Sequence, residues 1–251
     1  MTSENTPAAE AVLITGGASG IGLMCARQAA DRGARVAIID VNPAAAEAAV
    51  ASLSGEGHLA VAVDVTDADA MRRAADRFAE GGGITGVVAA AGIVSRAALV
   101  DIDVSEFRRV LEINVVGVQN TISAAAPHLI RAAPYGSVVV LGSAAAFTGG
   151  GLMGNGAYAT SKAALIGLVR GYARELAPHR VRVNMVAPGA TETPMTDVLS
   201  DADRERIAGM SLLGRLSRPE EIASAIAFLL APAVGTITGQ VVHVNGGVVF
   251  G

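Results

Sequence analysis

The sequence predicts an α/β fold in which one doubly wound parallel sheet is covered by helices on both faces. Short runs rich in Val, Ile, Leu and Ala alternate with longer helical patterns along the whole chain, and such runs are typical of strands buried on both faces of a sheet. No Pro-, Ser- or Gly-rich linker divides the 251 residues, which are enough to bury a large core. We therefore expect a single domain at 11–251 that follows a flexible tail at 1–10.

Composition and charge favour a protein that binds or converts a small molecule. Apolar residues make up 51% of the chain, but polar residues or glycines break every apolar run well short of a bilayer span. The net charge of −4 arises from 19 basic and 23 acidic residues spread along the chain, so nothing indicates nucleic acid or a membrane surface as a partner. The first ten residues lack the basic start and apolar stretch of a signal peptide, and we expect a cytoplasmic protein.

The cysteine and histidine content predicts no metal site. Cys25 is the only cysteine and is expected to be a small core residue in a reducing compartment. The four histidines are scattered without the spacing of metal ligands.

Seven strands are expected, in regular alternation with helices. Right-handed crossovers through the intervening helices would place them in one open parallel sheet. The expected strands are 11–15, 35–40, 59–63, 86–91, 137–141, 181–186 and 241–244.

The first expected strand ends in a glycine-rich turn, and a helical pattern follows it. Strand, glycine turn and helix occur in this order at dinucleotide sites, because glycine lets the backbone approach a pyrophosphate and the helix N-terminus attracts its charge. The turn reads Gly16-Gly17-Ala18-Ser19-Gly20-Ile21-Gly22.

Two acids follow the next two strands. Asp40 ends the second strand, where a carboxylate accepts hydrogen bonds from both ribose hydroxyls and repels a ribose phosphate, so NAD is favoured over NADP. Capping of Asn42-Pro43 and the following helix by Asp40 is the alternative, and it is compatible with cofactor binding. Asp64-Val65 follows the third strand and is expected to meet the adenine, with helix capping through Thr66 and Asp67 as the alternative.

Tyr158 and Lys162 are four residues apart in an expected helix and so project from one face. A nearby cation would stabilise the phenolate and lower the pKa of Tyr158 toward neutrality, which would make the pair a proton-transfer device. Taken alone, the spacing is equally typical of an amphipathic helix with a half-buried tyrosine and a solvated lysine. The neighbouring motifs decide between the two interpretations.

Together the motifs resemble those of the short-chain dehydrogenase/reductase family, from about Val12 to the C-terminus. The glycine turn after Thr15 and the Tyr158/Lys162 pair match two motifs of that family. Further matches follow in the family's order: Asn114-Val115-Val116-Gly117, Ser143, the stretch from Asn184 through Pro188-Gly189 to Thr193-Pro194-Met195, and the C-terminal stretches 214–223 and 238–247.

The resemblance implies a Rossmann-type fold and an NAD-dependent alcohol dehydrogenase or ketone reductase. Its catalytic residues would be Asn114, Ser143, Tyr158 and Lys162, without a metal. The residues that would bind the cofactor are Gly16, Ser19, Gly20, Ile21, Gly22, Asp40, Asp64, Val65, Gly92, Tyr158, Lys162, Pro188, Gly189, Thr191 and Thr193.

Each catalytic residue has an implied role. Tyr158 would exchange the hydroxyl proton of a secondary alcohol, and Ser143 would donate a hydrogen bond to the oxygen on which charge develops. By resemblance, Lys162 would bind the nicotinamide ribose and Asn114 would hold a water that connects Lys162 to solvent. Neither Ser143 nor Ser161 has the His and acid partners of an acyl-transfer nucleophile.

The sequence departs from the family at several positions. Ala89-Ala90-Ala91-Gly92 replaces the usual Asn-Asn-Ala-Gly, so hydrogen bonds that tie the central sheet together are absent or replaced. The interval between Ser143 and Tyr158 is slightly long, with the extra residues in 148–151. Thr191 and Asn245 replace a common aliphatic residue and a common Asp.

The residues expected around Ser143 indicate an apolar or alicyclic substrate. They are Ala144, Ala145, Phe147, Leu152 and Met153, with Ile93 and Val94 nearby by resemblance. Arg96 would either reach a substrate acid or be solvated. A 3-oxoacyl-thioester reductase is the alternative enzyme, and a non-catalytic NAD(H) sensor or scaffold is the alternative of another class.

Two features of the wider molecule are also expected. Residues 191–213 would form a mobile apolar lid over the site or an amphipathic helix packed on the core. By resemblance the protein would be a homotetramer that pairs the helices carrying Asn114 and Tyr158. The small residues Ala124-Ala125-Ala126 and Ala163-Ala164 would permit close packing there or inside one chain.

Overall fold

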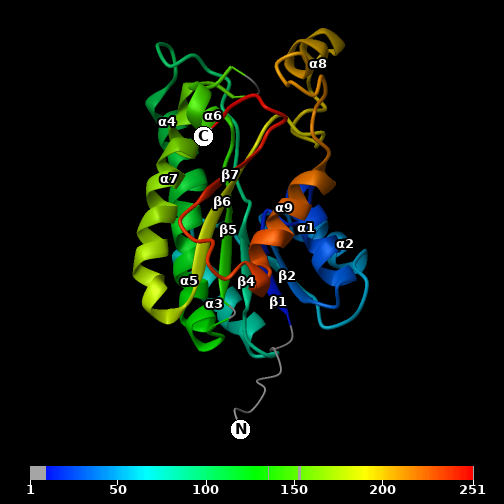
Figure 1. Ribbon diagram of the computed structural model, residues 1–251, viewed down its shortest axis with the longest axis vertical. Coiled ribbons are helices and arrows are strands. Elements are labelled where there is room, and N and C mark those ends of the chain that lie inside the picture. Colours follow the sequence, from blue (N-terminus) through cyan, green and yellow to red (C-terminus); the bar gives the residue numbers. More distant parts are fainter. Residues whose placement is uncertain (1–9, 135, 152–153, 251) are drawn as a thin grey trace.

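The computed structural model describes residues 10–134, 136–151 and 154–250. Seven parallel strands form one sheet in the order β3-β2-β1-β4-β5-β6-β7 (Figure 1). The order reverses between β1 and β4, so the carboxyl ends of these neighbouring strands open a crevice. The strands are β1 (Ala11–Thr15), β2 (Arg35–Asp40), β3 (Leu59–Ala62), β4 (Gly86–Ala89), β5 (Ser137–Leu141), β6 (Arg182–Pro188) and β7 (Val241–Val244).

Helices cover both faces of the sheet, which confirms the predicted fold class. In Figure 1, α1 (Gly20–Asp31), α2 (Pro43–Ala51) and α9 (Pro219–Leu230) lie on one side. On the other side lie α3 (Ala68–Ala79), α4 (Val104–Leu111), α5 (Gly117–Arg131) and α7 (Gly156–Leu176). The remaining helical segments are η1 (Glu112–Val116), α6 (Ala145–Thr148), η2 (Ala177–His179), α8 (Asp201–Ala208) and η3 (Pro232–Val234).

The strands are apolar on both faces because each face contributes to a separate core. Leu13 and Ile39 pack with Met71 and Leu165 beneath α3, α5 and α7. Their chain neighbours Ile14 and Ile38 point the other way, into the core beneath α1, α2 and α9. Alternate residues of a strand point to opposite faces, so continuous apolar runs are required here. Cys25 is buried in this second core, as expected.

The boundaries of three strands were predicted wrongly. β3 ends at Ala62 instead of residue 63, and β4 ends at Ala89 instead of 91. β4 ends early because the chain turns against the glycine turn there: a Cβ on Gly16 would lie 2.8 Å from the Ala91 backbone. β6 begins one residue late and continues to Pro188, which pairs with Val244 of β7.

The predicted tail at 1–10 falls outside the described residues except for Glu10. Among the described helices, none combines the length and apolar character needed to cross a bilayer.

Candidate active site

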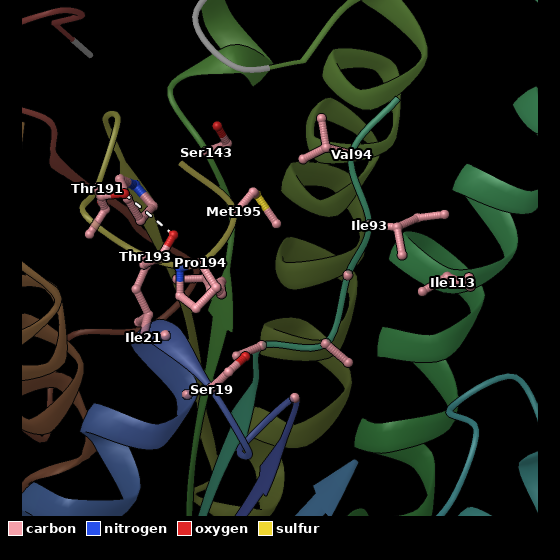
Figure 2. Close-up of a pocket in the computed structure, with 18 of the residues that line it drawn as sticks. Ser19, Ile21, Ile93, Val94, Ile113, Ser143, Thr191, Thr193, Pro194 and Met195 are labelled. Atoms are coloured by element: carbon pink, nitrogen blue, oxygen red, sulfur yellow. Dashed lines mark hydrogen bonds between the residues drawn. The ribbon is translucent and has the colours of Figure 1, made fainter. Parts of the chain in front are cut away.

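A cleft of about 720 Å³ lies at the carboxyl edge of the sheet. Figure 2 shows its arrangement: Ser19 and Ile21 of the glycine turn lie at the base, and Thr191 to Met195 form one wall. Ile93, Val94 and Ile113 approach from the other side. The carboxyl edge is where ligands bind in open α/β sheets, so the topology makes this cleft the candidate functional site.

The base of the cleft has bare backbone where a pyrophosphate would lie. Gly16 and Gly20 have φ values of 66° and 52°, which side-chain-bearing residues rarely adopt. A Cβ on Gly22 would lie 2.2 Å from the Gly16 carbonyl oxygen, and one on Gly20 would lie 3.3 Å from Thr193. The turn leads directly into α1, and the first N–H groups of this helix, which have no partner within the helix, lie at its cleft end. These glycines leave room for a dinucleotide, and the residues present fit such a cofactor.

Asp40 stands beside this cradle. Its Oδ2 accepts a hydrogen bond from the Ala18 amide at 3.3 Å, and its Oδ1 accepts one from the Asn42 amide at 3.1 Å. Asn42 itself caps α2, because its Oδ1 accepts the Ala45 amide at 3.1 Å. The capping role proposed for Asp40 therefore belongs to Asn42, while the Asp40 carboxylate lines the cleft.

Asp64 likewise lines the cleft and does not cap the helix that follows it. Asp67, and not Asp64, caps α3 by accepting the Ala70 amide at 2.9 Å. Asp64 accepts both the amide and the hydroxyl of Thr66 at 2.9 Å through Oδ1. Asp64 and Val65 both line the cleft, so the carboxylate is held at its rim by a local turn.

Asn114 lies behind the cleft, in the π-helix η1 between α4 and α5. Its Oδ1 accepts the Ile93 amide at 2.8 Å, and its Nδ2 donates to the Ile93 carbonyl at 2.9 Å and to Ser161 Oγ at 3.0 Å. Ser161 in turn donates to the Tyr158 carbonyl at 2.7 Å. The fully buried Asn114 thus ties the segment after β4 to α7. π-helical turns often occur at functional sites.

Ser143, Tyr158 and Lys162 meet on the wall formed by β5 and α7, and all three line the cleft. The structure confirms that Tyr158 and Lys162 lie on one helix. The Nζ atom of Lys162 is 5.7 Å from the centre of the Tyr158 ring and donates to the Leu141 carbonyl at 2.8 Å.

The expected lowering of the Tyr158 pKa was wrong for this structure. Burial raises the pKa of the Tyr158 phenol above its usual value, and the hydrogen bond with the Ser143 side chain opposes this rise only in part. Burial also lowers the pKa of Lys162 to about 8. The ammonium donates one of its three hydrogens to the Leu141 carbonyl at 2.8 Å.

The segment after β6 closes the opposite wall. The Gly189 amide donates to Val244 at 3.2 Å, and a Cβ on Gly189 would lie 3.0 Å from the Asn245 carbonyl oxygen. Thr193 is fixed by the bond from its amide to Thr196 Oγ1 at 2.9 Å. Pro188, Gly189, Thr191 and Thr193 all line the cleft. Every predicted cofactor-binding residue therefore lies around one cavity.

The predicted substrate side was correct only in part. Ile93, Val94 and Ala145 line the cleft, but Ala144 is buried in a separate small cluster with Ile207 and Leu216. Phe147 stacks on His243 with the ring centres 4.6 Å apart and does not line the cleft. Arg96 is exposed and is not a lining residue. Leu152 and Met153 lie outside the described residues.

Residues 191–213 form a turn-rich segment that carries α8 and stands away from the sheet (Figure 1). Ile207 is the buried residue of α8, whereas Val198, Leu212 and Leu213 are exposed. The segment is joined to the body through Ile207 and through hydrogen bonds such as that from the Leu212 amide to the Gly246 carbonyl at 2.8 Å, and it exposes apolar side chains between these attachments. Its predicted motion as a lid stays a prediction.

Sequence reasoning missed several lining residues because no local motif distinguishes them. Most are apolar or small residues that neighbour a motif, and two come from the helix that carries Asn114. The missed residues are Ile39, Val41, Val63, Ala90, Ala91, Arg109, Ile113, Leu141, Gly142, Ala190 and Thr196. Within the described residues, no cluster of potential metal ligands was found.

Comparison with known proteins gave consistent matches over almost the whole chain. A family model described as enoyl-(acyl carrier protein) reductase matches residues 16–249. The cis-4-hydroxycyclohexanecarboxylate dehydrogenase of Sinomonas cyclohexanicum is 39% identical over 94% of each chain. The 3-oxoacyl-[acyl-carrier-protein] reductase of Thermotoga maritima is 36% identical, covering 95% of this chain and 97% of the relative.

A solved structure supports the same conclusion. A short-chain type dehydrogenase/reductase from Mycobacterium marinum superposes with a TM-score of 0.90 and 34% identity, covering 98% of this chain and 97% of that chain.

Proposed function

Since the chain belongs to the short-chain dehydrogenase/reductase family of oxidoreductases that act on hydroxyl or keto groups, we propose that it interconverts a secondary alcohol and a ketone with NAD(H). The observation that carries this proposal is the meeting of Ser143, Tyr158 and Lys162 on one wall of the cleft whose base is the glycine turn.

In the proposed mechanism, Tyr158 takes the hydroxyl proton during alcohol oxidation and returns it during ketone reduction. Because burial raises its pKa, the phenol is protonated at neutral pH, which is the form that gives a proton to the substrate oxygen during ketone reduction. Ser143 donates a hydrogen bond to the substrate oxygen, where charge develops. A bound nicotinamide supplies the hydride chemistry, so no metal is needed.

Lys162 and Asn114 act around this step. The Lys162 ammonium provides a positive charge beside Tyr158 and is proposed to bind the nicotinamide ribose. Both amide hydrogens of the Asn114 side chain are donated, one to the Ile93 carbonyl and one to Ser161, and its oxygen accepts one hydrogen bond from the Ile93 amide. One acceptor position at Oδ1 remains for the proposed water. Asn114 therefore also positions the Ile93 segment of the cleft.

NAD is proposed over NADP because of the charge at the rim. The Asp40 carboxylate is fixed between the glycine turn and Asn42 by two backbone amides. A phosphate on the adenosine ribose would meet this negative charge, and the following residue, Val41, offers no cation. Two hydroxyls would instead donate hydrogen bonds to it.

An apolar or alicyclic substrate is proposed from the lining of the catalytic end. Ile93, Val94, Ala145 and Met195 present hydrocarbon or thioether surface there. The hydroxycyclohexanecarboxylate dehydrogenase of Sinomonas cyclohexanicum supports an alicyclic ring.

A 3-oxoacyl thioester is the second candidate substrate, favoured by the similarity to the reductase of Thermotoga maritima. A non-catalytic NAD(H) sensor or scaffold would not need the Ser143, Tyr158 and Lys162 set.

A homotetramer in the cytoplasm is also proposed. On α7, Ala163 and Ala164 are exposed and available for close packing with a second copy. Ala124 and Ala125 of α5 are instead buried in the core of their own chain. Light scattering that shows only monomer would contradict this assembly.

The testing experiment is an activity screen over cyclic, aromatic and acyl-thioester alcohols and ketones, with NADH and NADPH run in parallel. The proposal predicts turnover of apolar cyclic substrates and a higher kcat/KM with NADH. Preference for NADPH would contradict the role of Asp40. Tight NADH binding without turnover of any substrate would favour the sensor or scaffold.

A further inference from the structure

Arg109 is an exposed cation of the cleft to which the proposed chemistry gives no role. The basic residues among the described lining residues are Lys162, which is buried, and Arg109, which is exposed. Within the described part of the chain, Arg109 has no acidic partner at ion-pair distance, although other exposed arginines such as Arg72 and Arg215 do. Its neighbour Arg108 is also exposed but does not line the cleft.

Arg109 lies on the same helical run as two residues at the side of the cleft that carries Asp64 and Val65. Ile113 follows it one turn later, and Gly117 lies beyond the π-helix η1 on the continuous run of α4, η1 and α5. Gly117 abuts Val65, since a Cβ on Gly117 would lie 2.5 Å from Val65 Cγ2. Asn120, one turn further on, donates to the Val65 carbonyl at 2.9 Å. The end of this helical run at Gly117 and Asn120 therefore lies beside the segment that follows β3.

Figure 2 shows Ile113 projecting toward the cleft from the helix that faces the glycine turn and the Thr193 wall. Arg109 lies one turn before Ile113, nearer the mouth. On the same side, Asp64 and Val65 line the cleft. The lining of the cleft thus includes an apolar side chain and a guanidinium from this helical run, together with the fixed carboxylate of Asp64.

We propose that the Arg109 guanidinium packs against the adenine ring of the bound dinucleotide, on the side of the cleft formed by α4 and η1. A planar guanidinium stacks well on an aromatic face and remains charged at any working pH. Ile113 would support the same ring from one turn below. The contact lies away from Asp40, so it adds affinity without restoring tolerance of a ribose phosphate.

The proposal rests on the dinucleotide site of the proposed function, and a binding measurement separates the two. Titration calorimetry would give the Kd of NADH and of ADP-ribose for the wild type, Arg109→Gln and the matched control Arg108→Gln. An exposed cation–π contact predicts Kd values about three- to fivefold higher for both ligands in Arg109→Gln. Arg108→Gln should match the wild type. Arg109→Lys, which keeps the charge but loses the planar stacking surface, should give an intermediate value.

Three results would overturn the assignment. Equal ADP-ribose affinities for Arg109→Gln and Arg108→Gln would remove the adenine contact. An unchanged ADP-ribose Kd with a raised KM for substrate would place Arg109 at the substrate. A loss much larger for NADPH than for NADH would place it at the ribose phosphate. If the wild type bound NADPH but not NADH, the NAD proposal would fail while the same comparison, made with NADPH, would still test Arg109. Thermal unfolding of each variant controls for folding.

Discussion

The two walls of the cleft differ in how firmly they are built. On the wall of β5, η1 and α7, Asn114, Ser161 and Lys162 are buried and joined to the backbone by hydrogen bonds. On the opposite wall, Thr191 and Thr196 are buried but Met195 between them is 43% exposed, and the segment that continues to residue 213 leaves Leu212 and Leu213 exposed.

This difference suggests that the first wall carries the catalytic groups and that the second wall determines which substrates are accepted. Catalytic groups must be held within a fraction of an ångström, so they are placed on regular elements with fixed partners. The second wall is attached through the Ile207 cluster, the bridge from Thr191 to Ser217 and the hydrogen bond from the Leu212 amide to the Gly246 carbonyl at 2.8 Å. A loosely packed apolar segment can change shape to accept or enclose different substrates. Substitutions on the first wall should therefore lower turnover, and those on the second should change substrate preference.

The largest effect is expected at Ser143. Ser143→Ala removes the donor to the substrate oxygen, and loss of one such donor lowers kcat by roughly 100-fold or more in other enzymes. Steady-state kinetics at saturating NADH would measure it. Ser224→Ala on the exposed side of α9 is the control and should behave as the wild type. If Ser143→Ala kept more than half of the wild-type kcat, this wall would not stabilise the developing charge.

Gly154 tests whether the firm wall depends on close packing. A Cβ at position 154 would lie 2.6 Å from Tyr158 Cδ1, so Gly154→Ala must displace the ring or the loop. A displacement of about 1 Å costs up to roughly 100-fold in rate, and we expect kcat to fall about 10-fold or more. In Gly235→Ala, the new Cβ would make only an ordinary contact, 3.6 Å from Pro232. Equal kcat values for the two variants would show that the ring position tolerates movement.

Lys162 tests the cost of placing a charge in this wall. The pKa of the folded protein is lowered from 10.5 to about 8, so folding disfavours the ammonium and Lys162→Met should unfold at a higher temperature at pH 7. The stability difference is up to about 3 kcal/mol, reduced by any water that reaches the group.

The pH dependence has a defined sign. Between pH 8 and 10.5 the unfolded chain keeps the lysine proton that the folded protein has lost. The free energy of unfolding therefore increases as the pH rises through this range. Burial raises the pKa of Cys25 to about 12 from 9.0, which opposes this gain above pH 9. Subtracting the Lys162→Met curve from the wild-type curve removes the Cys25 contribution. A flat difference would contradict a buried ammonium.

The smallest effect is expected on the loose wall. Met195 lines the cleft and is 43% exposed. Met195→Ala removes apolar contact with the substrate and should raise KM about three- to tenfold for a large ring, with less change for a small one. Val198→Ala is the matched control, because Val198 is 66% exposed and does not line the cleft. Equal KM changes for both ring sizes would argue against selection by this wall.

The sequence was most informative where the backbone itself makes the site. The glycine turn and the strand ending at Asp40 are local features, and parallel strands bring such ends to one edge without further information. All predicted cofactor-binding residues consequently line the cleft. The spacing of Tyr158 and Lys162 likewise defines a shared helix face.

Features that depend on packing were less predictable. The pKa of Tyr158 is set by burial, which spacing does not reveal. Phe147 leaves the cleft because it stacks on His243, almost a hundred residues away in sequence. The π-helix that turns Asn114 toward Ile93 and Ser161 also has no simple sequence pattern.

The most direct test of the central claim uses Tyr158→Phe. With NADH at saturation, hydride transfer to a cyclic ketone in a single turnover would be compared with the wild type, and the NADH Kd would be measured on the same samples. The account predicts that the transfer rate falls roughly 100-fold or more while the NADH Kd changes little, because the phenol oxygen supplies the proton. Transfer at the wild-type rate by Tyr158→Phe would contradict the assignment of the proton step to this wall.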